Sequence, residues 1–199
     1  MNQGWLHAIA AFKLPSNAFS AEEVRSSNVV NSIIGDFHPW HWTLIAGTNI
    51  AIVAGTQDYS MAAADQNKVA DIANANLLEG ATEQPDLMVQ TWPTLRKETT
   101  QGQPIAVGLI SPTQVRLWPN PDTSYTFQWR YYARPAVLAA NTDNYNCPDS
   151  FQHVLLQGVI WKMSQLLDDD RQQVFKDEFY KELSELRAAE FRLNRRSRA

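Results

Sequence analysis

The sequence lacks the features that mark secreted and membrane proteins. It contains one cysteine, Cys147, among 199 residues, so no disulfide can form within the chain and the fold does not depend on an oxidising compartment. The apolar stretch WLHAIAAF near the N-terminus is too short to cross a bilayer or to serve as the core of a secretion signal. We therefore expect a soluble protein made in the cytoplasm, with no membrane partner.

Motifs of enzymes and cofactor sites are missing as well. The sequence has no G-x-S-x-G, no G-x-x-x-x-G-K-[ST] and no G-x-G-x-x-G, so the common nucleophile and phosphate-binding signatures are not present. His38 and His41 could share a metal, but no cysteine pair or H-E-x-x-H accompanies them, and Pro39 interrupts a helical spacing. We predict no catalytic residue, no metal and no cofactor, and a protein that works by contact.

The sequence has fewer basic than acidic residues, and arginines are concentrated near its C-terminus. The net charge of −4 argues against a protein built to grip nucleic acid over a broad surface. Acids outnumber bases from Asp168 to Glu185, whereas the C-terminal segment carries five arginines: Arg187, Arg192, Arg195, Arg196 and Arg198. Opposite charge blocks of this kind suit docking to a partner, and a solvated helix with a basic end is the simpler alternative.

Local patterns predict a helix, then a β-rich middle. Ser20 followed by Glu23 is a capping-box pattern for a first helix, which Gly35 would end. Short runs of β-branched and aromatic residues between turn residues predict strands at 49–54, 67–73, 104–110, 114–118 and 125–133. The PNPDTS segment between the last two predicts a hairpin connection. The spacing is typical of an antiparallel β-sandwich or small barrel.

The last predicted strand carries a row of aromatic side chains on one face. At a period of two residues, four rings alternate with mostly polar side chains. These rings are Tyr125, Phe127, Trp129 and Tyr131. Such regular alternation is expected of burial, so we interpret the row as core or interface of the β-domain. A ligand platform is the less favoured interpretation.

The C-terminal third predicts two helices at 150–167 and 171–193, joined as an antiparallel hairpin. Gly158 on the apolar face would let another backbone approach. The aspartates Asp168–Asp170 in the turn could bind a divalent cation, but capping of the second helix explains them better. We expect an α+β fold with three parts: an N-terminal extension and helix (1–43), a β-domain (44–140), and the hairpin with an extended basic tail (141–199). The first helix would pack with the hairpin.

Several motifs resemble the head-to-tail adaptor proteins of tailed bacteriophages. They are VNSII leading to Trp40 and Trp42, GTQDYSM at 55–61, VRLWPNPD at 115–122 followed by YTFQWRYYARP, NCPDSFQHVLLQGVIWKMSQLLDDD at 146–170, and FYKELSELRAAEFR. Their order and spacing cover roughly residues 28–192. Residues 1–20 depart from what the family leads us to expect.

The resemblance implies a structural ring, usually of twelve copies, in the neck of the virion. Such a ring docks on the portal protein, extends the channel through which DNA passes without sequence-specific binding, and meets a tail or nozzle protein through its β-domain. It assigns portal binding to Phe191, Arg192, Leu193, Arg195, Arg196 and Arg198. It places Asp168, Asp169 and Asp170 in the channel or between subunits.

Three other functions stay open at this point. A carbohydrate-binding β-module could use Trp118, Trp129 and Tyr132 as stacking platforms. A cell-wall hydrolase would need two converging carboxylates, which need not be close in sequence. A stopper or tail-terminator protein lower in the same neck would differ from an adaptor only in its partners.

Overall fold

The computed structural model describes residues 20–91, 99–138 and 148–196. The chain has an α+β fold, with helices at both ends and sheets between them, as predicted. It divides into two compact units. Among the described residues, those up to Trp42 and from Pro135 onward form a helical unit, and those within Thr43–Arg134 form a β-unit.

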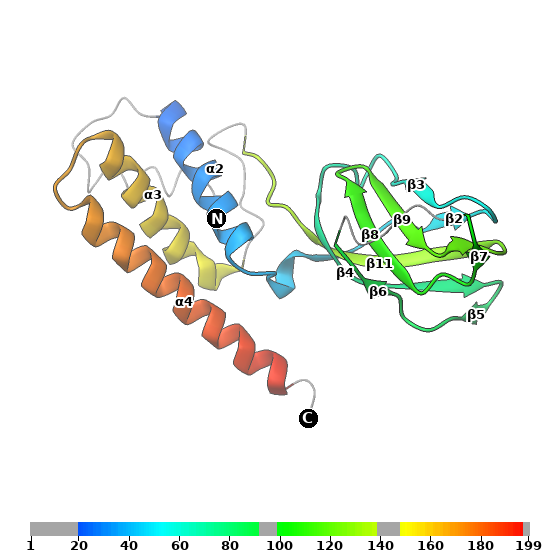
Figure 1. Cartoon of the computed structure of the whole chain (residues 1–199). Coiled ribbons are helices and arrows are strands. Elements are labelled where there is room, and N and C mark those ends of the chain that lie inside the picture. The colour runs from blue at the N-terminus through cyan, green and yellow to red at the C-terminus, as the bar shows by residue number, and fades with distance from the viewer. Residues whose placement is uncertain (1–19, 92–98, 139–147, 197–199) are drawn as a thin grey trace. The chain divides into compact units, whose positions relative to one another are not determined.

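Three helices make up the helical unit. They are α2 (Ser20–Phe37), α3 (Gln152–Leu166) and α4 (Gln172–Arg196), with a short 3-10 turn η2 (Asp149–Phe151) leading into α3. α3 lies between the other two, and α3 and α4 form the predicted antiparallel hairpin (Figure 1). α4 runs three residues beyond the predicted end at 193, since no glycine or proline interrupts it and its last turn is basic, which the helix dipole favours. No helix in the described residues is long and apolar enough to cross a membrane.

Two glycines let the elements of the helical unit approach closely. Gly35 does not end α2 as predicted, because it lies within the helix and a Cβ there would stand 2.6 Å from Pro135 Cγ. At Gly158 on α3, a Cβ would stand 2.5 Å from Val30 Cγ1 and 2.9 Å from Phe179 Cε2. The neighbours of Gly158 are therefore side chains from α2 and α4, not the backbone that the sequence led us to expect. The side chains of Val30 and Phe179 are fully buried.

A polar stripe on α2 holds the segment that follows the β-unit. The Asn28 side chain accepts from the Leu138 backbone N–H at 2.8 Å and donates to the Leu138 carbonyl at 2.9 Å. Asn31, one turn along, donates to the carbonyl of Ala136 at 3.3 Å. An amide side chain can pair with a peptide group in both directions, so α2 binds this extended segment through its main chain.

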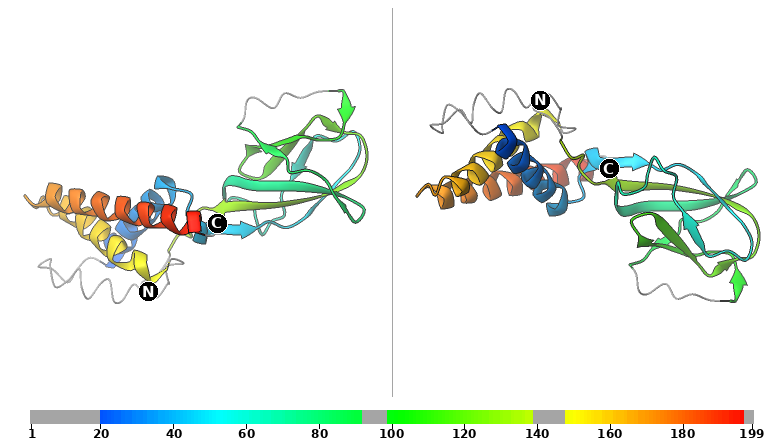
Figure 2. Two further views of the ribbon diagram at one scale, coloured as in Figure 1. Left: turned by 90° about the horizontal axis from the view of Figure 1, so that it is seen from below. Right: turned by 90° about the horizontal axis from the view of Figure 1, so that it is seen from above.

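The β-unit is built around a curled antiparallel sheet (Figure 2). Its strands are β1 (Leu44–Ala46), β2 (Ile50–Ile52), β4 (Val69–Glu79), β5 (Thr82–Glu83) and β11 (Tyr125–Ala133). The order is β1-β11-β4-β5, with β2 also paired to β11. The β4–β11 register shifts at two places, and such bulges bend a strand and increase its twist. The sheet therefore forms a half-barrel.

Two smaller sheets complete the β-unit. One has the order β3-β9-β8-β6, from β3 (Asp58–Ser60), β9 (Gln114–Trp118), β8 (Ala106–Ser111) and β6 (Met88–Val89). The other pairs β7 (Gln101–Gly102) with β10 (Asn120–Pro121). The β6–β8 and β7–β10 pairs are parallel. All five predicted strands are present, and the strands that were missed have two or three residues each, too few for a periodic pattern.

The predicted hairpin between 114–118 and 125–133 is wrong. β9 pairs with β3 and β8, whereas β11 pairs with β1, β2 and β4, so the two strands lie in different sheets. Between them, Asn120 and Pro121 pair with β7. Pro119 and Pro121 have no N–H to donate to a ladder, and the segment carries the chain from one sheet to the next. The actual hairpin joins β8 to β9, with Ser111 paired to Gln114.

Candidate assembly interface

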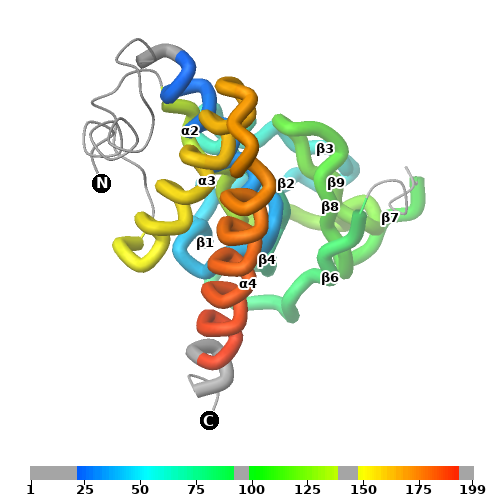
Figure 3. The backbone as a smooth tube through the Cα atoms, turned by 90° about the vertical axis from the view of Figure 1, so that its left-hand side faces the viewer, coloured from blue at the N-terminus to red at the C-terminus, as the bar shows by residue number. Residues whose placement is uncertain are grey.

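The C-terminal end of α4 extends beyond its partner in the hairpin. α4 has 25 residues against 15 in α3, and Figure 3 shows it continuing toward the C-terminus (red). At 1.5 Å per residue, the excess is about 15 Å. The last turns of α4 therefore extend past α3. They contact residues at the end of α2 and just after it.

Glu190 makes the main polar contact at this end. One carboxylate oxygen, Oε1, accepts from the His41 backbone N–H at 2.5 Å, and the other, Oε2, lies 3.3 Å from His38 Nε2. The side chains of His38 and Glu190 are only 13% and 14% exposed. Glu190 thus joins α4 to the segment after α2, and its position is 149 residues from that of His41 in the sequence.

Aromatic and cationic groups surround this contact. The rings of His38 and Phe191 lie 5.6 Å apart, and the Arg187 guanidinium lies 5.8 Å from the ring centres of both Phe37 and Phe191. Cation–π contacts of this kind contribute roughly 0.5–1 kcal/mol at exposed sites. Phe191 nevertheless stays 52% exposed, so one part of the ring packs on the protein and the rest faces outward.

The residues predicted to bind the portal share this helix end. Phe191 and Arg192 are exposed on α4. Leu193, Arg195 and Arg196 belong to the last helical turn of α4 instead of an extended tail, and Arg198 lies outside the described residues. The helix thus presents Phe191 with Arg192 beside it, on a segment that Glu190 fixes in place.

The turn between α3 and α4 contains the three predicted aspartates. Asp168 has a φ of 51°, and its N–H donates to the Gln165 carbonyl while the Asp169 N–H donates to the Ser164 carbonyl at 3.0 Å. This bond pattern is the Schellman motif, which normally carries glycine at the left-handed position. Asp168 therefore occupies a conformation that is costly for a residue with a Cβ.

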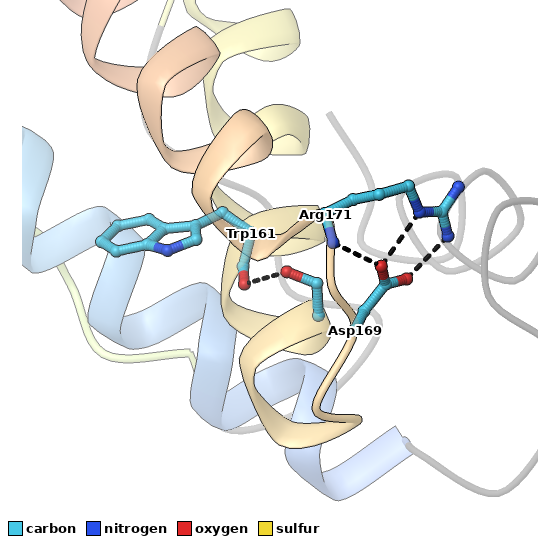
Figure 4. A network of polar contacts seen from close by, with 4 residues as sticks. Trp161, Asp169 and Arg171 are labelled. Atoms are coloured by element: carbon cyan, nitrogen blue, oxygen red, sulfur yellow. Dashed lines mark hydrogen bonds and ion pairs between the residues drawn. The ribbon is translucent and has the colours of Figure 1, made fainter.

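The Asp169 carboxylate forms hydrogen bonds to its neighbour Arg171. Its carboxylate accepts from the Arg171 backbone N–H at 2.8 Å, from Nε at 2.9 Å and from Nη2 at 2.6 Å (Figure 4). These hydrogen bonds lower the pKa of Asp169 to about 2. Asp168 and Asp170 are exposed. The contacts with Arg171 thus account for Asp169, and the other two carboxylates remain available for an assembly role.

The aromatic row on β11 is buried in the core of the β-unit. Tyr125, Phe127, Trp129 and Tyr131 are each less than 9% exposed. Trp129 donates from Nε1 to the Thr48 carbonyl at 3.0 Å. Burial, reinforced by a hydrogen bond to Asp65, raises the pKa of Tyr131 to about 12. Trp129 is only 4% exposed. It is therefore not accessible as one of the three rings that a carbohydrate-binding module would use for stacking.

The two histidines considered for a metal both contact Glu190, one through its ring and the other through its backbone. His38 lies against Glu190 and packs edge-on against Trp40 at 4.8 Å. His41 contributes its backbone N–H to the same Glu190. Within residues 20–91, 99–138 and 148–196, no group of three or more histidine, cysteine, aspartate or glutamate side chains is placed to hold a metal ion.

The contacts that position this end of the helical unit were not predicted from the sequence. Asn28, Asn31 and Gly35 recur at three and four residues, so they share one face of α2, and this stripe could have been noticed. Nothing local in the sequence links Glu190 to His38, because their contact depends on how α2 and α4 pack against α3.

Comparison with protein families agrees with this architecture. The family model described as SU10 adaptor protein matches residues 21–199. A search of curated proteins gave no match. The matched range contains α2 except its first residue, the β-unit and the α3–α4 hairpin, including the end of α4 and the aspartate turn. The chain therefore belongs to the SU10 adaptor protein family, a family of phage head–tail adaptors.

Proposed function

We propose that this protein forms a ring beneath the portal of a tailed phage, joins the capsid to the tail and extends the DNA channel. Its family makes it a phage neck adaptor, which indicates a structural, non-enzymatic protein and fits a location in the virion neck. The proposal adds the partners: the portal protein on one side, a tail or nozzle protein on the other, and about twelve copies of the chain.

The observation that carries the proposal is the exposed end of α4. Phe191 leaves half of its surface uncovered, and Arg192 is exposed beside it. Aromatic residues, phenylalanine included, and arginine are enriched in the cores of protein interfaces. Because Glu190 already ties this helix end to the segment after α2, little ordering remains to be done when a partner binds, and the loss of entropy on docking is reduced.

The same proposal assigns roles to the other parts. The helices, with residues 1–43 and 141–199, would form the body of the ring, and the β-domain at 44–140 would face the tail. Asp168 and Asp170 would line the channel or contact a neighbouring copy, where negative charge repels phosphate and lets DNA pass. Asp169 would serve the turn, since Arg171 occupies its carboxylate.

The test is the mass of the purified chain in solution, alone and after mixing with the portal of the same virus. We expect a portal-bound ring, and we expect Phe191→Ala to weaken portal binding at least about tenfold, the effect of a modest hot-spot residue. Val174→Ala is the matched control, because Val174 is 56% exposed at the other end of α4 and its loss should leave portal binding unchanged.

A charge test complements the apolar one. Arg192→Glu should weaken portal binding, whereas Lys181→Glu, an equal charge change at an exposed position in the middle of α4, should not. A C-terminally truncated chain should end at residue 192, so that Glu190 is retained and still holds the end of the helix. Wild-type affinity for Phe191→Ala and Arg192→Glu would show that this surface does not dock on the portal. A wild-type chain that binds only the tail-side protein would place it lower in the neck, as a stopper or tail terminator.

A further inference from the structure

A second surface lies in the β-unit, on the side of β11 opposite the buried face of the aromatic row. An open groove of about 430 Å³ crosses the outer side of the curled sheet. Its volume falls in the range of ligand-binding clefts. The function proposed above makes no use of it.

The floor of the groove consists of side chains from the two central strands. Gln128 and Arg130 on β11 stand opposite Asn76 and Asn74 on β4 in the strand register. They alternate with the buried residues, so they point away from the core. A register shift of β4 directly follows the Arg130–Asn74 pair, and bulges of this kind re-aim side chains.

Two walls flank this floor, and backbone hydrogen bonds hold both in place. On one side, Gly47 N–H donates to the Trp129 carbonyl at 3.0 Å, which fixes the segment after β1. On the other side, the segment after β5 donates from Gln84 and Leu87 N–H to carbonyls of β4, each at 2.8 Å. From β1 across β11 and β4 to β5 is about 14 Å at the usual strand spacing, the reach of about four extended residues.

The groups lining the groove have little to bind within the protein. Among the described residues, no hydrogen bond or ion pair engages the side chains of Asn74, Gln128 or Arg130, or that of Asp86 on the β5 side, whereas Asn76 donates to Glu83 at 2.5 Å. Among the described residues, no ion pair joins Arg130 to Glu83 or Asp86, the two acids that line the groove. The acids Glu83 and Asp86 thus lie at the β5 side, and the guanidinium lies on β11.

This chemistry matches a peptide better than a sugar. Amide side chains can donate to and accept from main-chain groups, as Asn28 does with Leu138 in the helical unit of the same protein. Two carboxylates complement a lysine or arginine side chain. The one aromatic residue lining the groove, Trp129, is 4% exposed, so the groove offers no open ring on which a sugar could stack.

We infer that this groove binds an extended peptide segment of a neighbouring neck protein, with a basic side chain of that segment placed between Glu83 and Asp86. The amides of Asn74 and Gln128 pair with its main chain, and Arg130 binds a carbonyl or an acidic group further along. The inference rests on the proposed function only for the class of partner, since a neck adaptor has protein neighbours.

The experiment uses the full chain and an array of overlapping short peptides from the portal and tail-side proteins of the same virus. We expect a subset of peptides containing lysine or arginine to bind. Asp86→Asn should lower their affinity about tenfold, the effect of losing one charge-assisted contact. Glu79→Gln is the matched control, because Glu79 is exposed on β4 but does not line the groove. Replacing the basic peptide residue with glutamine should cause a smaller loss in the Asp86→Asn variant than in the wild type, because only Glu83 is left to pair with it.

Three results would overturn the inference. They are the absence of any bound peptide, equal binding by wild type and Asp86→Asn, and an equal loss with Glu79→Gln, which would indicate charge attraction without a site. A glycan array provides a fourth, since binding of an oligosaccharide in place of peptides, abolished by Arg130→Gln, would make the groove a sugar site. Portal binding by Asp86→Asn is measured in parallel. Peptide binding by a chain that never binds its portal would refute only the proposed function.

Discussion

Gly158→Ala tests the packing of the helical unit, on which the position of α4 depends. The new Cβ would stand 2.5 Å from Val30 Cγ1 and 2.9–3.0 Å from two ring carbons of Phe179. Ordinary contacts between carbon atoms are about 3.5–4.0 Å. Val30 and Phe179 are both fully buried, so neither can turn toward solvent, and the helices must separate.

Two opposing effects set the size of the change. Alanine is favoured over glycine inside a helix by about 1 kcal/mol. Overpacking of a well-packed core costs about 1–3 kcal/mol, and contacts on two sides of the glycine place this site near the upper end. We therefore expect a net loss of about 2 kcal/mol, or a fall in Tm of roughly 8 °C for a unit of this size.

Urea denaturation followed by far-UV circular dichroism is the suitable assay, because the three long helices lie in the helical unit. Ala188→Gly, at an exposed position of α4, measures the helix-propensity effect alone and should cost about 1 kcal/mol. Val30→Ala removes the atom nearest the new methyl group. The double variant should therefore be less destabilised than the sum of the single ones, by about 1 kcal/mol.

A Gly158→Ala variant as stable as wild type, or more stable, would refute this reasoning. It would mean that the helices can adjust without cost and that glycine is not required for their approach. Simple additivity of the two single variants would locate the strain away from Val30.

The remaining predictions concern the aspartate turn and the β-unit. Asp168→Gly should raise the free energy of unfolding by about 1 kcal/mol, because glycine adopts the left-handed conformation without strain and an acid is removed from the end of α3; a lower urea midpoint would contradict it. The pKa of Asp169 is lowered to about 2 from 3.8 by Arg171, so the stabilisation from this pair is complete above about pH 4 and is lost toward pH 2. The stability difference between wild type and Arg171→Gln should shrink over that window, and a constant difference would show that Asp169 does not titrate there. Gly47→Ala would place a Cβ 2.2 Å from the Trp129 ring and should destabilise the β-unit by about 2–3 kcal/mol, measured by tryptophan fluorescence; an unchanged midpoint would mean that the wall of the groove yields.

Elements whose patterns are local could be predicted from the sequence alone. The alternation of Tyr125 to Tyr131 predicted β11 to the residue, because a strand with one buried face must repeat every two positions. The three- and four-residue spacing of apolar side chains likewise predicted α3 and α4 to within a few residues. The motifs along the chain also indicated the family that the comparison shows.

Which elements contact one another could be learned only from the three-dimensional structure. β11 pairs with β4, some 50 residues earlier, and not with β9 next to it, and nothing in a local pattern names the partner strand. The contact of Glu190 with His38 and the groove beside Asp86 arise in the same way. Each brings together side chains from segments far apart in the chain, and their meeting depends on how whole elements pack, which periodicity in one segment does not encode.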